Sequence, residues 1–222
     1  MTALLRYQIS LLLHSQRWLP PILLYGTYLA VGVQAGQPVL DALGYAAAAL
    51  LPVTAWLVRI CVTQEPDAAR AVTAAATGTH RAHLAALLAA TVFAGVLAAV
   101  GTLIVLVISE PLNADHTVEV PLLPAGSAGL LAAAVCLLLG LAVGALCSRP
   151  LLRRRGWSIA VNAVVALAAL VVVGSPAKYA ISGLVTGSLT GAVHIPALPF
   201  VAAALVAAVA AATACAVAVR RG

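Results

Sequence analysis

Charged residues are scarce in this sequence. They make up 8% of its 222 residues, whereas 64% are hydrophobic. A soluble globular domain carries roughly 25% charged residues, so the composition excludes a soluble fold of this size and makes lipid the natural surroundings. Strict alternation of apolar and polar residues is also absent, and alanine and leucine dominate, which favours helices over a membrane barrel. We therefore expect an all-α integral membrane protein.

Lysine is nearly missing as well. The only lysine is Lys178, and a tyrosine follows it. A phosphate-binding P-loop ends in Gly-Lys-Ser or Gly-Lys-Thr, so this chain cannot carry that motif. If ATP drives the protein, another polypeptide must bind the ATP and its Mg²⁺, and we expect no cofactor in this chain.

Acidic residues are missing from the interiors of the long apolar stretches. Ion-coupled carriers normally keep an acid or a histidine deep in the membrane, but Asp41 lies close to the outer end of its stretch. Asn162 is the most polar candidate inside a stretch, and a hydrogen bond between helices is its simplest role. These gaps argue against an ion-driven carrier.

Catalytic and metal-binding patterns are missing too. Ser188 and His194 are six residues apart with a proline behind them, which makes a poor catalytic dyad. His80 and His83 are three apart, but two histidines alone make a poor zinc site, and none of the four cysteines lies at metal-ligand spacing. An intramembrane enzyme is therefore disfavoured, and we assign no catalytic residue and no metal ligand.

The sequence does contain a series of long apolar stretches. A bilayer core of about 30 Å needs about 20 apolar residues per helix. We expect six stretches to cross the membrane, at residues 18–35, 38–61, 82–109, 127–147, 157–174 and 199–219. Pro52 should kink the second of them, because it removes a backbone donor and crowds the preceding turn.

Arginines set the expected topology. Cytoplasmic flanks of spans are enriched in Lys and Arg. With the N-terminus inside, Lys178 alone falls outside, and all the arginines fall inside. These arginines are Arg6, Arg17, Arg59, Arg70, Arg81, Arg149, Arg153, Arg154, Arg155, Arg220 and Arg221. We therefore expect both termini in the cytoplasm, and we attribute the net charge of +6 to topology, with no nucleic-acid partner.

Residues 3–17 precede the first span and have a helical pattern of their own. Arg6, Ser10, His14 and Arg17 recur at steps of four, four and three. Apolar residues fill the rest of the wheel, which suits a helix lying in the inner membrane interface. The alternative is a cytoplasmic extension of the first span.

Residues 175–198 are nearly as apolar as the spans, but a crossing here would carry the C-terminal arginines outside. We expect an outer element that dips into the membrane and returns, which is tolerated only where protein covers its backbone. Gly183, Gly187 and Gly191 fall at steps of four, and small residues on one helix face let another helix approach closely. The alternative is that these glycines merely accompany an alanine-rich composition.

Residues 63–83, TQEPDAARAVTAAATGTHRAH, are the longest polar interruption in the first half of the chain. Pro66 suits the start of a helix and Gly78 suits its end. We expect a short cytoplasmic helix between the second and third spans. Its many alanines leave it thin, which suits a groove on a partner, and the alternative is a solvated surface helix.

This arrangement resembles the membrane subunit of type-2 ABC exporters over nearly the whole chain. The resemblance rests on the segment ending in SQRW, the six spans with both ends inside, the element EPDAARAVTAAATGTHRAH and the apolar outer insertion. In that family the element after the second span docks onto the ATPase subunit, a role that would fall on Glu65, Arg70 and Arg81. The outer insertion of the family forms re-entrant helices that roof the path.

The resemblance implies a multi-pass permease subunit of a bacterial cell membrane, without enzyme activity of its own. It would pair with a second permease copy or paralogue and with two cytoplasmic ATP-binding subunits, in contact with membrane lipid. The competing interpretation is an integral-membrane accessory or scaffold protein with no transport path. The substrate stays open, because apolar span walls suit lipids, peptides and drugs alike.

Overall fold

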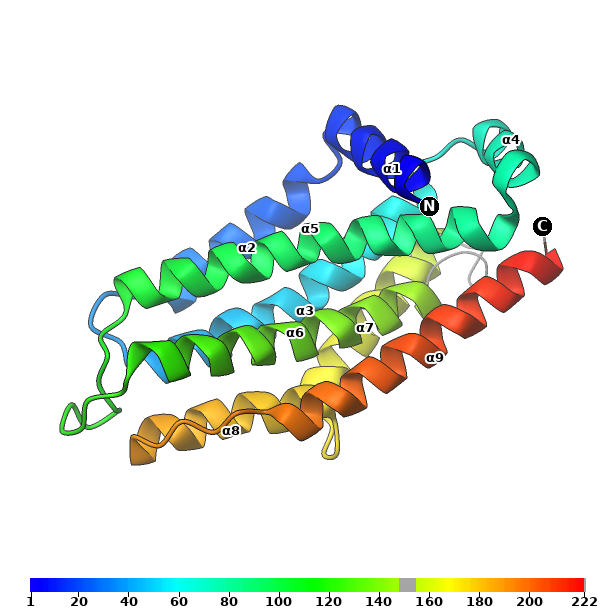
Figure 1. The fold of residues 1–222 in the computed structure, drawn as a ribbon. Helices are drawn as coiled ribbons and strands as arrows, with labels where there is room; N and C mark the ends of the chain where they lie inside the picture. The colour runs from blue at the N-terminus through cyan, green and yellow to red at the C-terminus, as the bar shows by residue number, and fades with distance from the viewer. Residues whose placement is uncertain (148–154, 222) are drawn as a thin grey trace.

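The computed structural model describes residues 1–147 and 155–221, which form a bundle of α-helices (Figure 1). The only strand-like pairings in this described part are two isolated bridges, Pro38 with Glu110 and Leu112 with Glu119. The helices are α1 (Thr2–Ser15), α2 (Leu19–Gly32), α3 (Val39–Thr63), α4 (Asp67–Thr77), α5 (Thr79–Ile108), α6 (Leu122–Cys147), α7 (Arg155–Val171), α8 (Pro176–Thr190) and α9 (Ala197–Arg221). The expected all-α class is confirmed for these residues.

Four of the helices, α3, α5, α6 and α9, are long and apolar enough to cross a membrane. A fifth crossing arises if α7 and α8, which meet at a bend of 46°, count as one span. Helix α2 has only 14 residues, so it is about 21 Å long and shorter than the ~30 Å core. The chain therefore has the architecture of a multi-pass membrane protein. By length and composition it has four or five candidate spans, whereas the sequence predicted six.

Helices α3 and α6 form the centre of the bundle and approach closely at two glycines of α6. A Cβ at Gly140 would lie 2.6 Å from the carbonyl oxygen of Leu51, and one at Gly144 would lie 2.9 Å from that of Ala55. Such distances bring the two backbones together without a side-chain layer between them, as small residues allow in membrane helices. Helix α3 also continues through Pro52 without a break.

The two ends of the bundle differ in content (Figure 1). Both termini and α4 lie at one end, which we call the terminal end. The connection between α5 and α6, residues 109–121, lies at the opposite end with the connection between α2 and α3, and we call this the loop end. The acids at the loop end are Asp41, Glu110, Asp115 and Glu119.

Arginines occupy elements of the terminal end, as the charge pattern predicts. Those with described side chains are Arg6, Arg17, Arg59, Arg70, Arg81 and Arg220. Arg149, Arg153 and Arg154 lie outside the described residues, as do the side chains of Arg155 and Arg221. The membrane side that each end faces remains a prediction.

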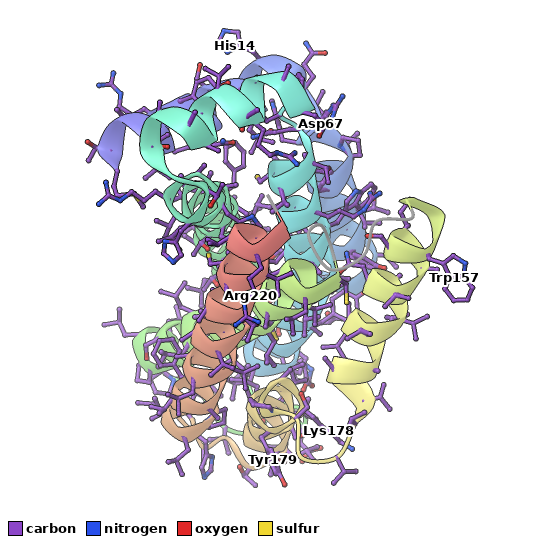
Figure 2. The ribbon with its side chains drawn as sticks, turned by 90° about the vertical axis from the view of Figure 1, so that its right-hand side faces the viewer. His14, Asp67, Trp157, Lys178, Tyr179 and Arg220 are labelled. Atoms are coloured by element: carbon purple, nitrogen blue, oxygen red, sulfur yellow. The ribbon has the colours of Figure 1, made fainter. Side chains whose placement is uncertain are left out.

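Lys178 lies at the bend between α7 and α8, part-way along the bundle, rather than beyond the loop end (Figures 1 and 2). Its ammonium group donates a hydrogen bond of 3.3 Å to the carbonyl of Val171 in the last turn of α7. A cation at a helix C-terminus satisfies carbonyls that have no partner within the helix. The bend itself follows from Gly174, which has a φ of 95°, and from Pro176 at the start of α8.

The segment predicted as an outer dip, residues 175–198, is helix α8 followed by an extended return (Figure 1). Helix α8 runs on from α7 and reaches the loop end, where the amide of Ala114 donates to the carbonyl of Ser188 at 2.9 Å. The chain therefore reaches the loop end at the close of α8, and residues 191–196 lead back to α9.

Helix α1 is separate from α2, because Gln16 takes a left-handed conformation with a φ of 53° between them. It is therefore not an extension of α2. Leu12 is fully buried and belongs to a cluster with Ala86 and Leu87 of α5, whereas His14 projects away from the bundle in Figure 2. Helices α1 and α4 lie on the opposite side of the bundle from α8 (Figures 1 and 2).

Candidate functional site

The predicted short helix after the second span is α4, from Asp67 to Thr77. Pro66 occupies the N-cap position, and Asp67 places a carboxylate at the positive end of the helix dipole. Gly78 ends the helix with a φ of 89°, a conformation that glycine adopts without strain. None of the side chains of α4 is buried, so the helix presents most of its surface outward.

Glu65, just before α4, is buried, with 6% of its surface exposed. Its Oε1 accepts hydrogen bonds from the phenol of Tyr7 at 3.3 Å and from the hydroxyl of Thr73 at 2.8 Å. Its Oε2 accepts from the Nε2 of Gln8 at 3.4 Å. The carboxylate thus joins α1 to α4, and burial together with the Glu65 charge raises the pKa of Tyr7.

Arg70 turns back from α4 onto the end of α3. One of its amino groups donates to the carbonyl of Val62 at 2.9 Å and to that of Glu65 at 3.1 Å. These are carbonyls at the C-terminus of α3, where a guanidinium both satisfies the hydrogen bonds and complements the helix dipole. Its other contact is a 3.8 Å ion pair with Asp67, whose side chain is 81% exposed.

Gln64 completes the link between α1 and α3. Its Nε2 donates to the side-chain oxygen of Gln8 at 3.0 Å and to the backbone carbonyl of Gln8 at 3.3 Å. We call the connected group the polar cluster, and it consists of Tyr7, Gln8, Gln64, Glu65, Arg70 and Thr73. Three segments of chain therefore meet through side chains at the terminal end.

The three residues that the sequence suggested as partner contacts have different surroundings. Glu65 and Arg70 are engaged inside the chain, and only Arg81, in the first turn of α5, is exposed. Glu65 is buried in this chain, and its expected contact with a partner stays a prediction. The outward surface of α4 instead consists of small apolar residues around Val72, which is 71% exposed; these are Ala68, Ala71, Ala75 and Ala76.

The three glycines predicted to share one packed face have different surroundings. A Cβ at Gly183 would meet no atom within 4 Å. A Cβ at Gly187 would lie 2.5 Å from the carbonyl oxygen of Ala192, so this glycine lets residues 191–196 return against α8. Gly191 follows the last residue of α8 and has a φ of 74°, so its role is to end the helix.

Sequence reasoning missed the glycines at the main helix contact. Gly140 and Gly144 of α6 have the same spacing of four as those predicted in α8, and they lie in the long stretch GLAVG. The signal was present as a pair of small residues four apart in an apolar helix. This pair does not stand out in the sequence, because glycine occurs in most of the spans.

Side chains considered for chemistry are not assembled into a site. The hydroxyl of Ser188 and Oδ1 of Asn162 are buried without a hydrogen-bond partner in the part of the chain that the structure describes, whereas His194 is exposed. Within residues 1–147 and 155–221, no three His, Cys, Asp or Glu side chains gather as a metal-binding group would require. The terminal end, with α4 and the polar cluster, is therefore the best candidate functional site.

Comparisons with known proteins do not assign a family to this chain. No protein-family model, no curated protein and no solved structure matches this chain.

Proposed function

We propose that this chain is the permease subunit of an ATP-driven exporter of the type-2 ABC class. The observation that carries the proposal is α4, a short helix held between the ends of two long apolar helices, α3 and α5, with no buried side chain of its own. A helix in that position can receive a push from a soluble partner and pass it to both spans. The missing P-loop lysine means that the ATP must be bound by that partner.

In the proposed complex, two copies of the chain, or this chain and a paralogue, cross the membrane six times each and enclose the path. Both termini and α4 face the cytoplasm, where each α4 contacts one of two ATP-binding subunits. The contact surface of α4 is the apolar face around Val72, and the exposed Arg81 at the start of α5 adds a cation. Glu65 and Arg70 set the position of α4 and do not touch the partner.

Rigid attachment supports this coupling role. Arg70 and the Glu65 carboxylate fix the start of α4 to the end of α3, and α4 continues into α5 after Gly78 alone. When ATP draws the two partners together, α4 would carry the ends of α3 and α5 with it. The spans would then tilt and open the path outward.

Co-purification tests the docking surface. Val72 is 71% exposed, so Val72→Glu leaves the folded chain intact but places a charge on the proposed contact surface, where burial of an unpaired charge is strongly unfavourable. We expect the variant to reach the membrane in normal amount and to lose the bound ATPase and transport.

The matched control is Leu123→Glu, the same change at a residue of the loop end that is 89% exposed. It should keep the ATPase. If Val72→Glu retains both partner and transport, α4 is not the docking helix. A purified chain without any ATPase should hydrolyse no ATP, and a chain that binds no ATPase from its own source organism would favour the accessory or scaffold function instead.

A further inference from the structure

The Glu65 carboxylate is an acceptor shared by two helices that the sequence separates by more than 50 residues. Tyr7 and Gln8 of α1 donate to it from one side, and Thr73 of α4 donates from the other. The hydroxyl of Thr73 is also 2.8 Å from the carbonyl of Ala69. Its single hydrogen favours the carboxylate, because hydrogen bonds to an ionised acceptor are the stronger ones.

Helix α1 has two buried side chains, Gln8 and Leu12, and Gln8 belongs to the polar cluster. Leu4, Leu5 and Ile9 are half-buried. Leu12 packs against α5, so it holds the far end of α1 but not the part near Tyr7. The hydrogen bonds that tie the N-terminal half of α1 to other segments go to Gln64 and Glu65.

We infer that Glu65 is a positioning residue that locks α1 to α4, so that displacement of α4 releases the N-terminal half of α1. Moving α4 away withdraws Thr73 and shifts the backbone that Arg70 holds. The carboxylate then loses its position opposite Tyr7 and Gln8, and α1 loses its attachment. The coupling is reciprocal, since free energy that links two sites acts in both directions.

This lock is a property of the chain itself and does not rest on the proposed exporter function. It gives α1 two states, attached and released, and makes the choice between them depend on α4. A partner that binds α4, whatever its activity, would therefore alter how α1 lies at the membrane. Glu65→Gln distinguishes the hydrogen-bonding role of Glu65 from its space-filling role, because it keeps the size of the side chain but replaces one of the two acceptor oxygens by a donor.

Hydrogen exchange of the full chain in lipid nanodiscs tests the lock without any ATPase. In Glu65→Gln we expect amide exchange in residues 2–9 to rise at least about tenfold, because Tyr7 and the buried Gln8 lose an ionised acceptor. Exchange in residues 109–121 at the loop end should stay unchanged. The control is Asp67→Asn, the same carboxylate-to-amide change at an exposed neighbour, which should leave α1 as it is.

Two further variants decide the outcome if Glu65→Gln disturbs the whole fold. Thr73→Val removes only the donor from α4 and should still raise exchange in residues 2–9. Ala74→Pro breaks α4 itself and should release α1 although no residue of α1 has changed. Unchanged exchange in residues 2–9 in both variants would overturn the lock. Failure of Val72→Glu to release an ATPase would leave these results intact and would count against the exporter function alone.

Discussion

The two ends of the bundle are closed by different kinds of bond. At the loop end, backbone hydrogen bonds join the connections. The amide of Val39 donates to the carbonyl of Glu110, and the amide of Glu110 donates to the carbonyl of Gln37. The amide of Ala114 donates to the carbonyl of Ser188. At the terminal end the corresponding links are side chains, those of Gln64, Glu65 and Arg70. The loop end therefore depends on chain path, and the terminal end depends on residue identity.

This difference separates a fixed end from an adjustable one. Backbone hydrogen bonds between connections persist through most substitutions, because every residue except proline supplies the same donor and acceptor. The charges at the loop end add little, since the 3.5 Å pair of Glu110 and His116 is half exposed and exposed pairs contribute only ~0–1 kcal/mol. Side-chain links can be lost one at a time, so movement is more readily built into the terminal end.

The largest expected effect concerns which side each end faces. The four native cysteines are buried, so a new exposed cysteine can be labelled against a low background. In intact cells, a membrane-impermeant maleimide should label Asp115→Cys at the loop end fully. It should label Ala71→Cys on α4 only after the membrane is permeabilised. The reverse pattern would invert the topology and remove α4 from the cytoplasm.

A stability effect of several degrees should distinguish two glycines of α8. A side chain at Gly187 would lie 2.5 Å from a backbone oxygen of the returning segment, whereas one at Gly183 would meet nothing within 4 Å. Gly187→Leu should cost about 1–3 kcal/mol or more from overpacking and lower the thermal midpoint in detergent, with loss of exchange protection at the loop end. Gly183→Leu should do neither. Equal tolerance at both positions would show that residues 191–196 are not packed against α8.

The smallest expected effect concerns a side chain of the loop end, that of Asn113, and its contribution to stability. Oδ1 of the buried Asn113 accepts from the amides of Thr117 and Val118 at 2.8 and 3.0 Å. Asn113→Ala should lower the free energy of unfolding by about 1–2 kcal/mol, the usual contribution of two hydrogen bonds. Asp115→Ala, an exposed change in the same connection, should have no measurable effect on the midpoint. A loss larger than that caused by Gly187→Leu would contradict a loop end held mainly by its backbone.

Local patterns predicted the helices well, and long-range contacts explain what they missed. Each predicted span coincides with a helix, because apolar length and flanking charge are local properties. Helix α6 starts at Leu122, earlier than predicted, because proline is tolerated in the first turn of a helix. The short length of α2 and the bend between α7 and α8 were not predicted, although Gly174 and Pro176, which produce the bend, are visible in the sequence.

The short helix of the candidate site was predicted from the sequence, but its contacts were not. The sequence indicated a helix after the second span and drew attention to Glu65 and Arg70, but as outward contacts. Their inward roles depend on Tyr7 and Gln8, more than 50 residues away, and no local periodicity encodes that proximity. Spacing within one segment cannot show which residues another segment will cover.

The contact between α3 and α6 has a consequence for how the bundle can rearrange. Gly140 and Gly144 sit where Leu51, Ala55 and Val58 of α3 leave no room for a Cβ. Sliding α6 by one helical turn would bring Cys136 into the place of Gly140, and a shift of one residue would bring Leu139 or Leu141 there. The pair therefore has a single register, and we expect α3 and α6 to move together in any rearrangement of the bundle.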